Sequence, residues 1–192
     1  FADISEAHDA IGLTATSGVI ITIPQRDGTR LDYELDGKTA FIDQSLVAEN
    51  QIGRLNFTMM HEAAHQLFWM LYPEEYEAQI PRCVFRMADE HTQYPILDWE
   101  EWQTNVLTSF LLLPKELVYR HMADVGLKDG ITVLNRIYAR KDYEHFSEAA
   151  KRLGVSKTAL AIRSSQLGLV GRNDLYDPYA LVDIFPEKNE IA

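Results

Sequence analysis

The sequence predicts an α+β protein with a small three-stranded sheet, two buried helices and a C-terminal helical unit. Three observations support this class. Short strand-like segments separated by Asp-Gly turns lie within the first 42 residues, apolar stretches without Gly or Pro occupy the middle, and helical spacing dominates after residue 114. Over 192 residues we expect a core at 1–125, a helical subdomain at 126–172 and a tail at 173–192 that packs on the core.

Three strands are expected in the N-terminal region. Ser17–Ile23 is rich in β-branched residues, Arg30–Leu35 alternates apolar and polar side chains, and Thr39–Ile42 is a third short segment. Turns at Gln25–Gly28 and at Asp36-Gly37 separate them. Because consecutive strands joined by short turns usually pair, we expect one three-stranded antiparallel meander.

The segment Leu55–Leu71 predicts a buried helix that carries the motif His61-Glu62-Ala63-Ala64-His65. The segment contains neither Gly nor Pro, is apolar nearly all round at helical spacing, and is followed by Pro73. Residues i and i+4 share a helix face, so both imidazoles can reach one zinc ion, with Glu62 beside it as general base. The alternative is a pair of core histidines satisfied by hydrogen bonds, although burying these polar groups without a partner is costly.

A catalytic zinc site needs a third protein ligand, and Glu101 is the candidate. It lies in the first turn of a second predicted buried helix, which Asp98 would cap. Asn105 follows on the same face, where its amide would orient a histidine ligand from the outer shell. Glu100 competes for the ligand role, but Thr104, four residues after it, is a poorer outer partner. Both glutamates could instead be solvated acids of a first helical turn.

The two motifs resemble those of the ImmA/IrrE family of zinc metallo-endopeptidases. They read Asn56-Phe57-Thr58-Met59-Met60 followed by HEAAH, and Glu101-x-x-Thr104-Asn105-x-Leu107-Thr108-x-x-Leu111-Leu112-Leu113-Pro114. Thr104, Leu107, Thr108 and Leu113 replace the usual Ala, Phe, Ala and Met, which keeps the burial pattern and the candidate ligands. The resemblance covers residues 39–169. It implies a zincin-like core, a Zn²⁺ cofactor and cleavage of a helix–turn–helix transcriptional repressor.

The connection between the two motif helices, Tyr72–Leu97, is long and predicts a lid or specificity loop. We therefore expect cleavage of a specific, partly exposed segment of a partner protein, and poor cleavage of unfolded proteins in general. Cys83 or His91 in this loop could approach the metal. In the more ordinary interpretation, Cys83 packs as a small hydrophobe and His91 lies at the surface.

The chain after Pro114 has a helical pattern. The expected helices are Lys115–Met122, Gly130–Arg140 capped by Asp129, Glu144–Leu153 and Lys157–Leu167. The last two flank a turn at Gly154-Val155-Ser156 and form a helix–turn–helix pattern, which is also similar to a segment of the same family. Such a unit can bind DNA, but it is also an ordinary way to pack two short helices.

Composition favours a cytoplasmic enzyme over a nucleic-acid-binding protein. The 29 acidic and 18 basic residues give a formal net charge of −11, which opposes binding to phosphates. Cys83 is the single cysteine, so an intrachain disulfide is excluded. The sequence has no apolar stretch of membrane-spanning length and does not open with a signal-peptide pattern. We expect a protein substrate and neither a nucleic-acid nor a membrane partner.

These residues together predict a zinc-dependent endopeptidase. His61, His65 and Glu101 would hold zinc, and Glu62 would take a proton from the water that attacks the peptide carbonyl. The side chain that stabilises the oxyanion would be Tyr119, His121 or His145. The main alternative is a DNA-binding regulator whose zinc site is a sensor or a structural element. A zinc hydrolase that acts on a non-peptide amide is a second alternative.

Overall fold

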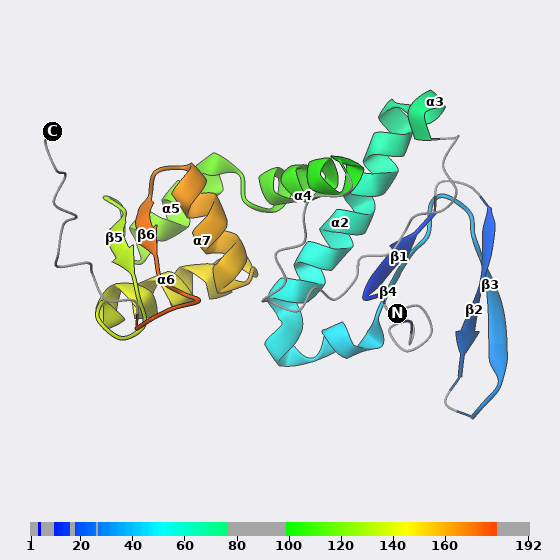
Figure 1. The fold of residues 1–192 in the computed structure, drawn as a ribbon, viewed down its shortest axis with the longest axis horizontal. Helices are drawn as coiled ribbons and strands as arrows, with labels where there is room; N and C mark the ends of the chain where they lie inside the picture. Colours follow the sequence, from blue (N-terminus) through cyan, green and yellow to red (C-terminus); the bar gives the residue numbers. More distant parts are fainter. Residues whose placement is uncertain (1–3, 5–9, 16–17, 26, 77–98, 180–192) are drawn as a thin grey trace, which may run out of the picture. The chain divides into compact units, whose positions relative to one another are not determined.

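The computed structural model describes residue 4 and residues 10–15, 18–25, 27–76 and 99–179 (Figure 1). These residues belong to two compact units. The first contains the described residues up to Lys115 together with Gly154–Ser156, and the second contains Glu116–Leu153 and the described residues from Lys157 onward. Each unit combines helices with short strands, so the α+β class is confirmed.

The strands of the first unit form two antiparallel pairs. β1 (Gly12–Thr14) pairs with β4 (Ala40–Ile42), and β2 (Val19–Pro24) pairs with β3 (Arg30–Leu35). The predicted three-stranded meander is therefore wrong, because the third expected strand leaves the hairpin and pairs with β1. All of β1 is buried. A buried strand of three residues shows no polar–apolar alternation, so the sequence pattern did not reveal it.

The hairpin β2–β3 packs on the β1–β4 pair through its inward-facing side chains. Ile21 and Ile23 share a buried cluster with Leu13, and Tyr33 packs edge-on against Phe41 with ring centroids 5.3 Å apart. Two short 3-10 helices, η1 (Gln44–Val47) and η2 (Glu49–Gln51), then lead from β4 to the long helix of this unit. Of these strands, β1 and β4 contact that helix.

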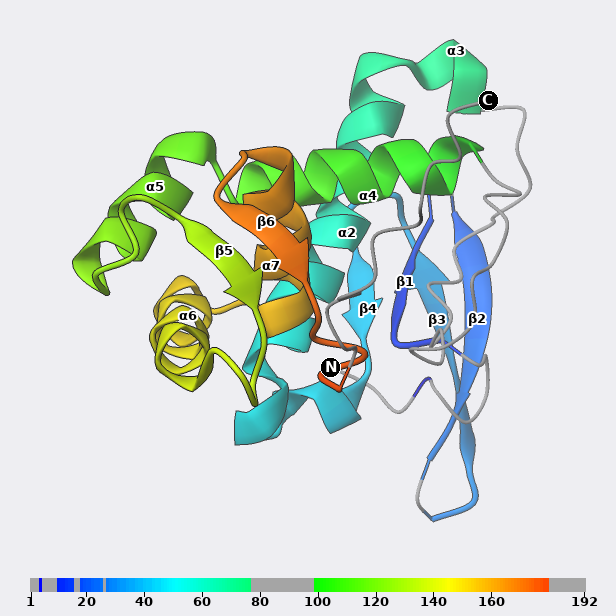
Figure 2. The same cartoon turned by 60° about the vertical axis from the view of Figure 1, so that its left-hand side comes forward.

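Helix α2 (Ile52–Leu71) is the helix predicted around the HEAAH motif, and α3 (Pro73–Tyr76) follows it. α2 contacts β1 and β4 and packs against α4 (Trp99–Leu112), which runs across it (Figures 1 and 2). The expectation that α2 is buried all round is wrong, because Met59 and Met70 are 47% and 69% exposed. The sheet and α4 cover only part of its surface. The buried residues of α2 are Thr58, His61, Glu62 and Ala64.

Within the described residues, the second unit contains three helices and two strands: α5 (Lys115–Asp124), β5 (Ile131–Leu134), α6 (Arg140–Leu153), α7 (Lys157–Gln166) and β6 (Val170–Asn173). The first residue of α5, Lys115, belongs to the first unit. β5 and β6 form a parallel pair. The core of this unit is mainly apolar, although Asn135 and Ser164 are also fully buried. Its fully buried large side chains are Val118, Met122, Leu134, Phe146 and Leu160.

The predicted helix Gly130–Arg140 is wrong: Ile131–Leu134 forms strand β5, and of the predicted residues only Arg140 is helical, as the first residue of α6. Gly130 has φ +81°, and a Cβ there would lie 2.7 Å from the Leu169 carbonyl oxygen. The N–H of Ile131 donates to that same oxygen at 2.7 Å, which begins the parallel pairing with β6. The partner strand is distant in sequence, so a short apolar run gave no local sign of strand.

The helices expected on either side of Gly154–Ser156 are confirmed as α6 and α7, and Gly154 has φ +64° at the turn. A DNA-binding role for this pair stays a prediction. The start of the expected tail is hydrogen-bonded to the end of β5 and to the residue after it. The Asp174 N–H donates to the Leu134 carbonyl, and Nδ2 of Asn135 donates to the Pro178 carbonyl. The rest of the tail, 180–192, lies outside the described residues. Among the described helices, none combines the length and apolar character needed to cross a membrane.

Candidate metal centre

Helix α2 places the two histidines of the motif side by side. His61 and His65 are one helical turn apart, and their rings meet edge to face with centroids 4.7 Å apart. The two Nε2 atoms are separated by 3.1 Å. Both side chains are largely withdrawn from solvent, at 0% and 11% exposure. The i, i+4 spacing has therefore directed both Nε2 atoms to one point, as helix geometry predicts.

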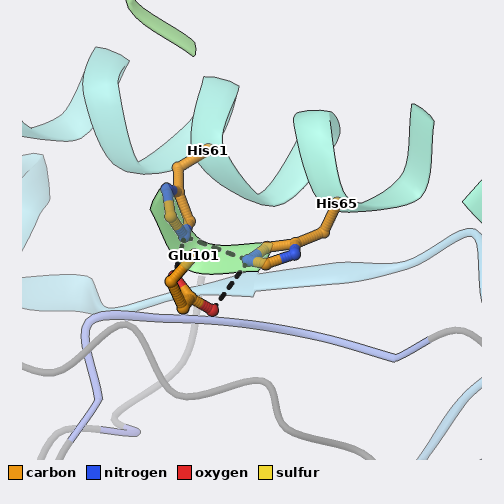
Figure 3. A group of neighbouring side chains, drawn as sticks. All are labelled: His61, His65 and Glu101. Atoms are coloured by element: carbon orange, nitrogen blue, oxygen red, sulfur yellow. Dashed lines mark hydrogen bonds and ion pairs between the residues drawn. The ribbon is translucent and has the colours of Figure 1, made fainter. Parts of the chain in front are cut away.

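Helix α4 brings the Glu101 carboxylate to the same point. Oε2 lies 3.2 Å from His61 Nε2, and Oε1 lies 3.2 Å from His65 Nε2 (Figure 3). One ligand atom from each of the three residues lies within 4.8 Å of the others, so the group can hold a metal ion. Glu100, the competing candidate, is not part of this group.

The spacing of these atoms fits a metal better than a hydrogen-bond network. A tetrahedral site with zinc–nitrogen bonds of about 2.0–2.1 Å has ligand–ligand distances of about 3.3–3.4 Å. The distances of 3.1 and 3.2 Å are close to these values. Without a metal, both histidines must carry a hydrogen on Nε2 to donate to Glu101, and those two N–H groups would then face each other across 3.1 Å. A cation among the three atoms removes this conflict.

The pKa values show how the metal-free centre distributes its charge. Burial lowers the pKa of His61 below its ordinary value. Burial also opposes charge on His65, but the hydrogen bond and charge of Glu101 outweigh it, so the pKa of His65 is raised. For Glu101, burial is likewise outweighed by the hydrogen bonds from both histidines, and its pKa falls to about 2. Glu101 is therefore an anion over the whole physiological range.

Glu62 lies beside this group but is not one of its ligand candidates. Its side chain is 1% exposed, and its Oε2 has no hydrogen-bond partner among the described residues. Burial raises the pKa of Glu62 to about 8 in the metal-free protein, and the nearby charge of Glu101 adds to the rise while that of His65 opposes it. A buried carboxyl oxygen without a partner is costly and therefore indicates a site where something binds.

Strand β1 approaches Glu62 at Gly12, and this contact had no signal in the sequence. A Cβ at Gly12 would overlap Oε1 of Glu62 and would lie 2.6 Å from Cγ2 of Thr58. Glycine is therefore required because the strand backbone passes against the Glu62 side chain. The absent side chain at Gly12 leaves the space that the carboxylate occupies.

Two further side chains of α4 lie close to the two histidines. The Asn105 side chain lies near His61 and tends to raise the pKa of its imidazole, so Asn105 lies at the histidine that its position on the helix predicted. Thr104 Oγ1 lies 3.4 Å from His65 Nδ1 and 2.9 Å from the Glu100 carbonyl oxygen. Sequence reasoning missed Thr104, having judged it only as a partner for Glu100. Its position three residues after Glu101 was the available signal.

The remaining predicted residues are not among the described residues of the first unit. Cys83, His91 and the rest of 77–97 lie outside the described residues, as does the proposed cap Asp98. Tyr119, His121 and His145 belong to the second unit, where the Tyr119 hydroxyl donates to the Leu167 carbonyl at 3.2 Å.

Comparisons with protein-family models, with curated proteins and with solved structures found no match to this chain. The resemblance to the ImmA/IrrE family consequently rests on the sequence motifs alone.

Proposed function

We propose that this chain is a zinc-dependent endopeptidase. The observation that carries the proposal is the convergence of His61, His65 and Glu101 on one point beside the buried carboxyl group of Glu62. Two imidazoles and one carboxylate are a common ligand set of catalytic zinc, which keeps an open coordination position for water or substrate. A structural zinc site normally uses four protein ligands, so the three found among the described residues favour a reactive centre.

Glu62 favours zinc hydrolysis over other chemistry at such a group. Two histidines and one carboxylate also suit iron(II) in oxygenases. Peptide hydrolysis needs, in addition, a base that accepts a proton from water within hydrogen-bond reach of the metal. Glu62 is the candidate for this role, and its Oε2 has no hydrogen-bond partner among the described residues that would compete for the proton.

In the proposed reaction, the side chains of this chain bind, orient and move a proton. Bound zinc would supply Lewis acidity, which polarises the peptide carbonyl and acidifies water. Glu62 accepts a proton from the attacking water at Oε2 and then donates it to the leaving amine. Gly12 leaves room for Oε1 of Glu62, so the carboxylate stays directed beside the ligand group. Asn105 supports the ligand His61.

The proposed substrate is a helix–turn–helix transcriptional repressor, which would place the enzyme in the cytoplasm. Support for this step comes from the motif resemblance alone, because the residues of the centre do not identify the protein that would be cleaved. The net charge of −11 favours association with a basic segment of a partner.

The test is cleavage by matched zinc-loaded proteins. Wild type and Glu62→Gln are incubated with the repressor encoded beside the gene, and new termini are identified by mass spectrometry. We expect products from wild type only, with equal zinc content in both proteins. Products from both proteins would overturn the role of Glu62.

Zinc binding without any cleavage would overturn the endopeptidase assignment. A mobility-shift assay with duplex DNA at low salt then tests the regulator interpretation, since the proposed enzyme is expected to bind little DNA.

A further inference from the structure

Thr104 contacts two groups of opposite hydrogen-bonding character. Its side chain is fully buried on the face of α4 that packs toward α2. Oγ1 lies 2.9 Å from the Glu100 carbonyl oxygen in its own helix and 3.4 Å from Nδ1 of His65 in the other helix. Both contacts involve the single hydroxyl group, so their directions depend on each other.

The Glu100 carbonyl determines where the hydroxyl hydrogen points. A carbonyl oxygen can only accept, so the 2.9 Å contact uses the one hydrogen of Thr104. The hydroxyl then presents a lone pair toward His65, and the 3.4 Å contact is favourable only if Nδ1 of His65 carries the hydrogen. A neutral imidazole has one N–H, so this leaves the lone pair on Nε2. Nε2 is the atom of His65 that faces His61 and Glu101.

We propose that Thr104 is a positioning residue that holds His65 in the Nδ1–H tautomer and so presents the Nε2 lone pair to the metal. The proposal rests on the metal-binding part of the proposed function. Outer hydrogen bonds of this kind fix both the tautomer and the ring orientation of a ligand histidine. The contact also links the two motif helices directly, because the hydroxyl belongs to α4 and the ligand to α2.

A matched pair of threonines makes the role testable. Thr108 lies one turn further along α4, is also fully buried, and its Oγ1 has no hydrogen-bond partner among the described residues. Thr104→Val and Thr108→Val therefore remove the same hydroxyl from similar surroundings, with nearly the same change in volume. Thr104→Ser keeps the hydroxyl and serves as the rescue variant.

The experiment measures the zinc dissociation constant of wild type and the three variants by chelator competition at one fixed pH. We expect Thr104→Val to weaken binding by about 10–100-fold, as is typical of outer-shell partners. Thr104→Ser and Thr108→Val should remain near wild type. Melting curves of the metal-free proteins show whether the two valine variants are equally folded.

A second measurement follows the exchange of the His65 Nδ1–H proton with solvent. In the zinc-loaded protein, the Nδ1–H proton of His65 should give a slowly exchanging NMR signal in wild type, Thr104→Ser and Thr108→Val, and a rapidly exchanging one in Thr104→Val. Equal zinc affinity and equal exchange in both valine variants would overturn the role of Thr104 while leaving the proposed enzyme intact. Zinc binding that depends on Thr104 without peptide cleavage would support the inference and overturn the proposed activity. A wild type that binds no zinc would overturn both.

Discussion

Helices α2 and α6 bury different kinds of side chain. The buried face of α6 consists of Phe146, Ala149 and Ala150, and its charged residues pair at the surface, as Arg152 does with Glu148 at 2.8 Å. The buried face of α2 includes Thr58, His61 and Glu62 instead. Burial of apolar groups stabilises a fold, whereas burial of polar groups costs free energy unless a partner satisfies them.

The difference indicates what each helix contributes. The packing of α6 accounts for its buried residues without any ligand. Packing alone does not satisfy the polar groups on the buried face of α2. Within the described residues, Oε2 of Glu62 and Oγ1 of Thr58 have no hydrogen-bond partner. A helix whose buried face is completed by a ligand should therefore lose function when altered, while α6 should lose stability.

The largest effect is expected at the third ligand. Glu101→Ala should weaken zinc binding by well over the roughly 100-fold upper range of outer-shell changes, because a direct ligand is lost. Asn105→Ala should fall within about 10–100-fold, since it acts through His61. Glu100→Ala should have little effect and is the matched control. Chelator competition measures the zinc affinity of all three variants. A larger loss of affinity in Glu100→Ala than in Glu101→Ala would show that Glu100, and not Glu101, is the ligand.

The opposite behaviour is expected for α6. Phe146→Ala removes a fully buried aromatic ring and should lower the unfolding free energy by about 3–5 kcal/mol. Zinc affinity of the folded protein should not change, because Phe146 belongs to the second unit. Urea denaturation followed by circular dichroism measures the stability. A large fall in zinc affinity at unchanged stability would break the contrast between the two helices.

Gly12 offers a way to disturb Glu62 without touching the ligands. Gly12→Ala would place Cβ against Oε1 and displace the carboxylate, so hydrolysis should fall on the order of 10²-fold, as expected for a displacement of about 1 Å. Zinc affinity should stay close to wild type, because His61, His65 and Glu101 are unchanged. Steady-state cleavage rates and zinc titration separate the two effects. Parallel loss of zinc would mean that β1 positions the ligands instead of the general base.

The pH dependence of stability provides a test that is specific to Glu62. In the metal-free protein the pKa of Glu62 is raised from 4.5 to about 8, so the folded state retains a proton that the unfolded state releases. Stability should therefore be fully present below pH 4.5 and fall as the pH rises toward 8, by up to about 1.4 kcal/mol per pH unit. Glu62→Gln should reduce this slope and leave the contributions of His61 and His65, whose pKa values are lowered and raised, respectively.

A second group acts at the acid end of the same curve. The pKa of Glu101 is lowered to about 2, so its contribution is present above pH 4.5 and is lost as the pH falls toward 2. Denaturation in the presence of a chelator across this range measures both effects. An unchanged slope above pH 4.5 in Glu62→Gln would show that another buried group is responsible.

Local spacing was enough to predict most of the centre. The i, i+4 relation of His61 and His65 depends only on helix geometry, and the same relation placed Asn105 on the face of Glu101. Helix positions followed from apolar periodicity and from the absence of Gly and Pro, so α2, α4, α6 and α7 could be predicted to within a few residues.

Pairings between distant segments were not accessible in this way. The exchange of partners that joins β4 to β1, and the parallel pairing of β5 with β6, depend on residues far apart in the chain. Strands of three or four residues show too little periodicity to reveal such partners, so β1 and β6 were missed and β5 was taken for a helix.

The sequence alone determined which residue types could meet on one face of each motif helix, because that depends on 3.6 residues per turn. Only the tertiary structure decided how α4 lies across α2, and therefore that Glu101 reaches both histidines and that Thr104 reaches His65. The same is true of Gly12 and Glu62, whose contact exists because a buried strand passes the helix. Distances between elements are set by the packing of whole side chains, which no single segment encodes.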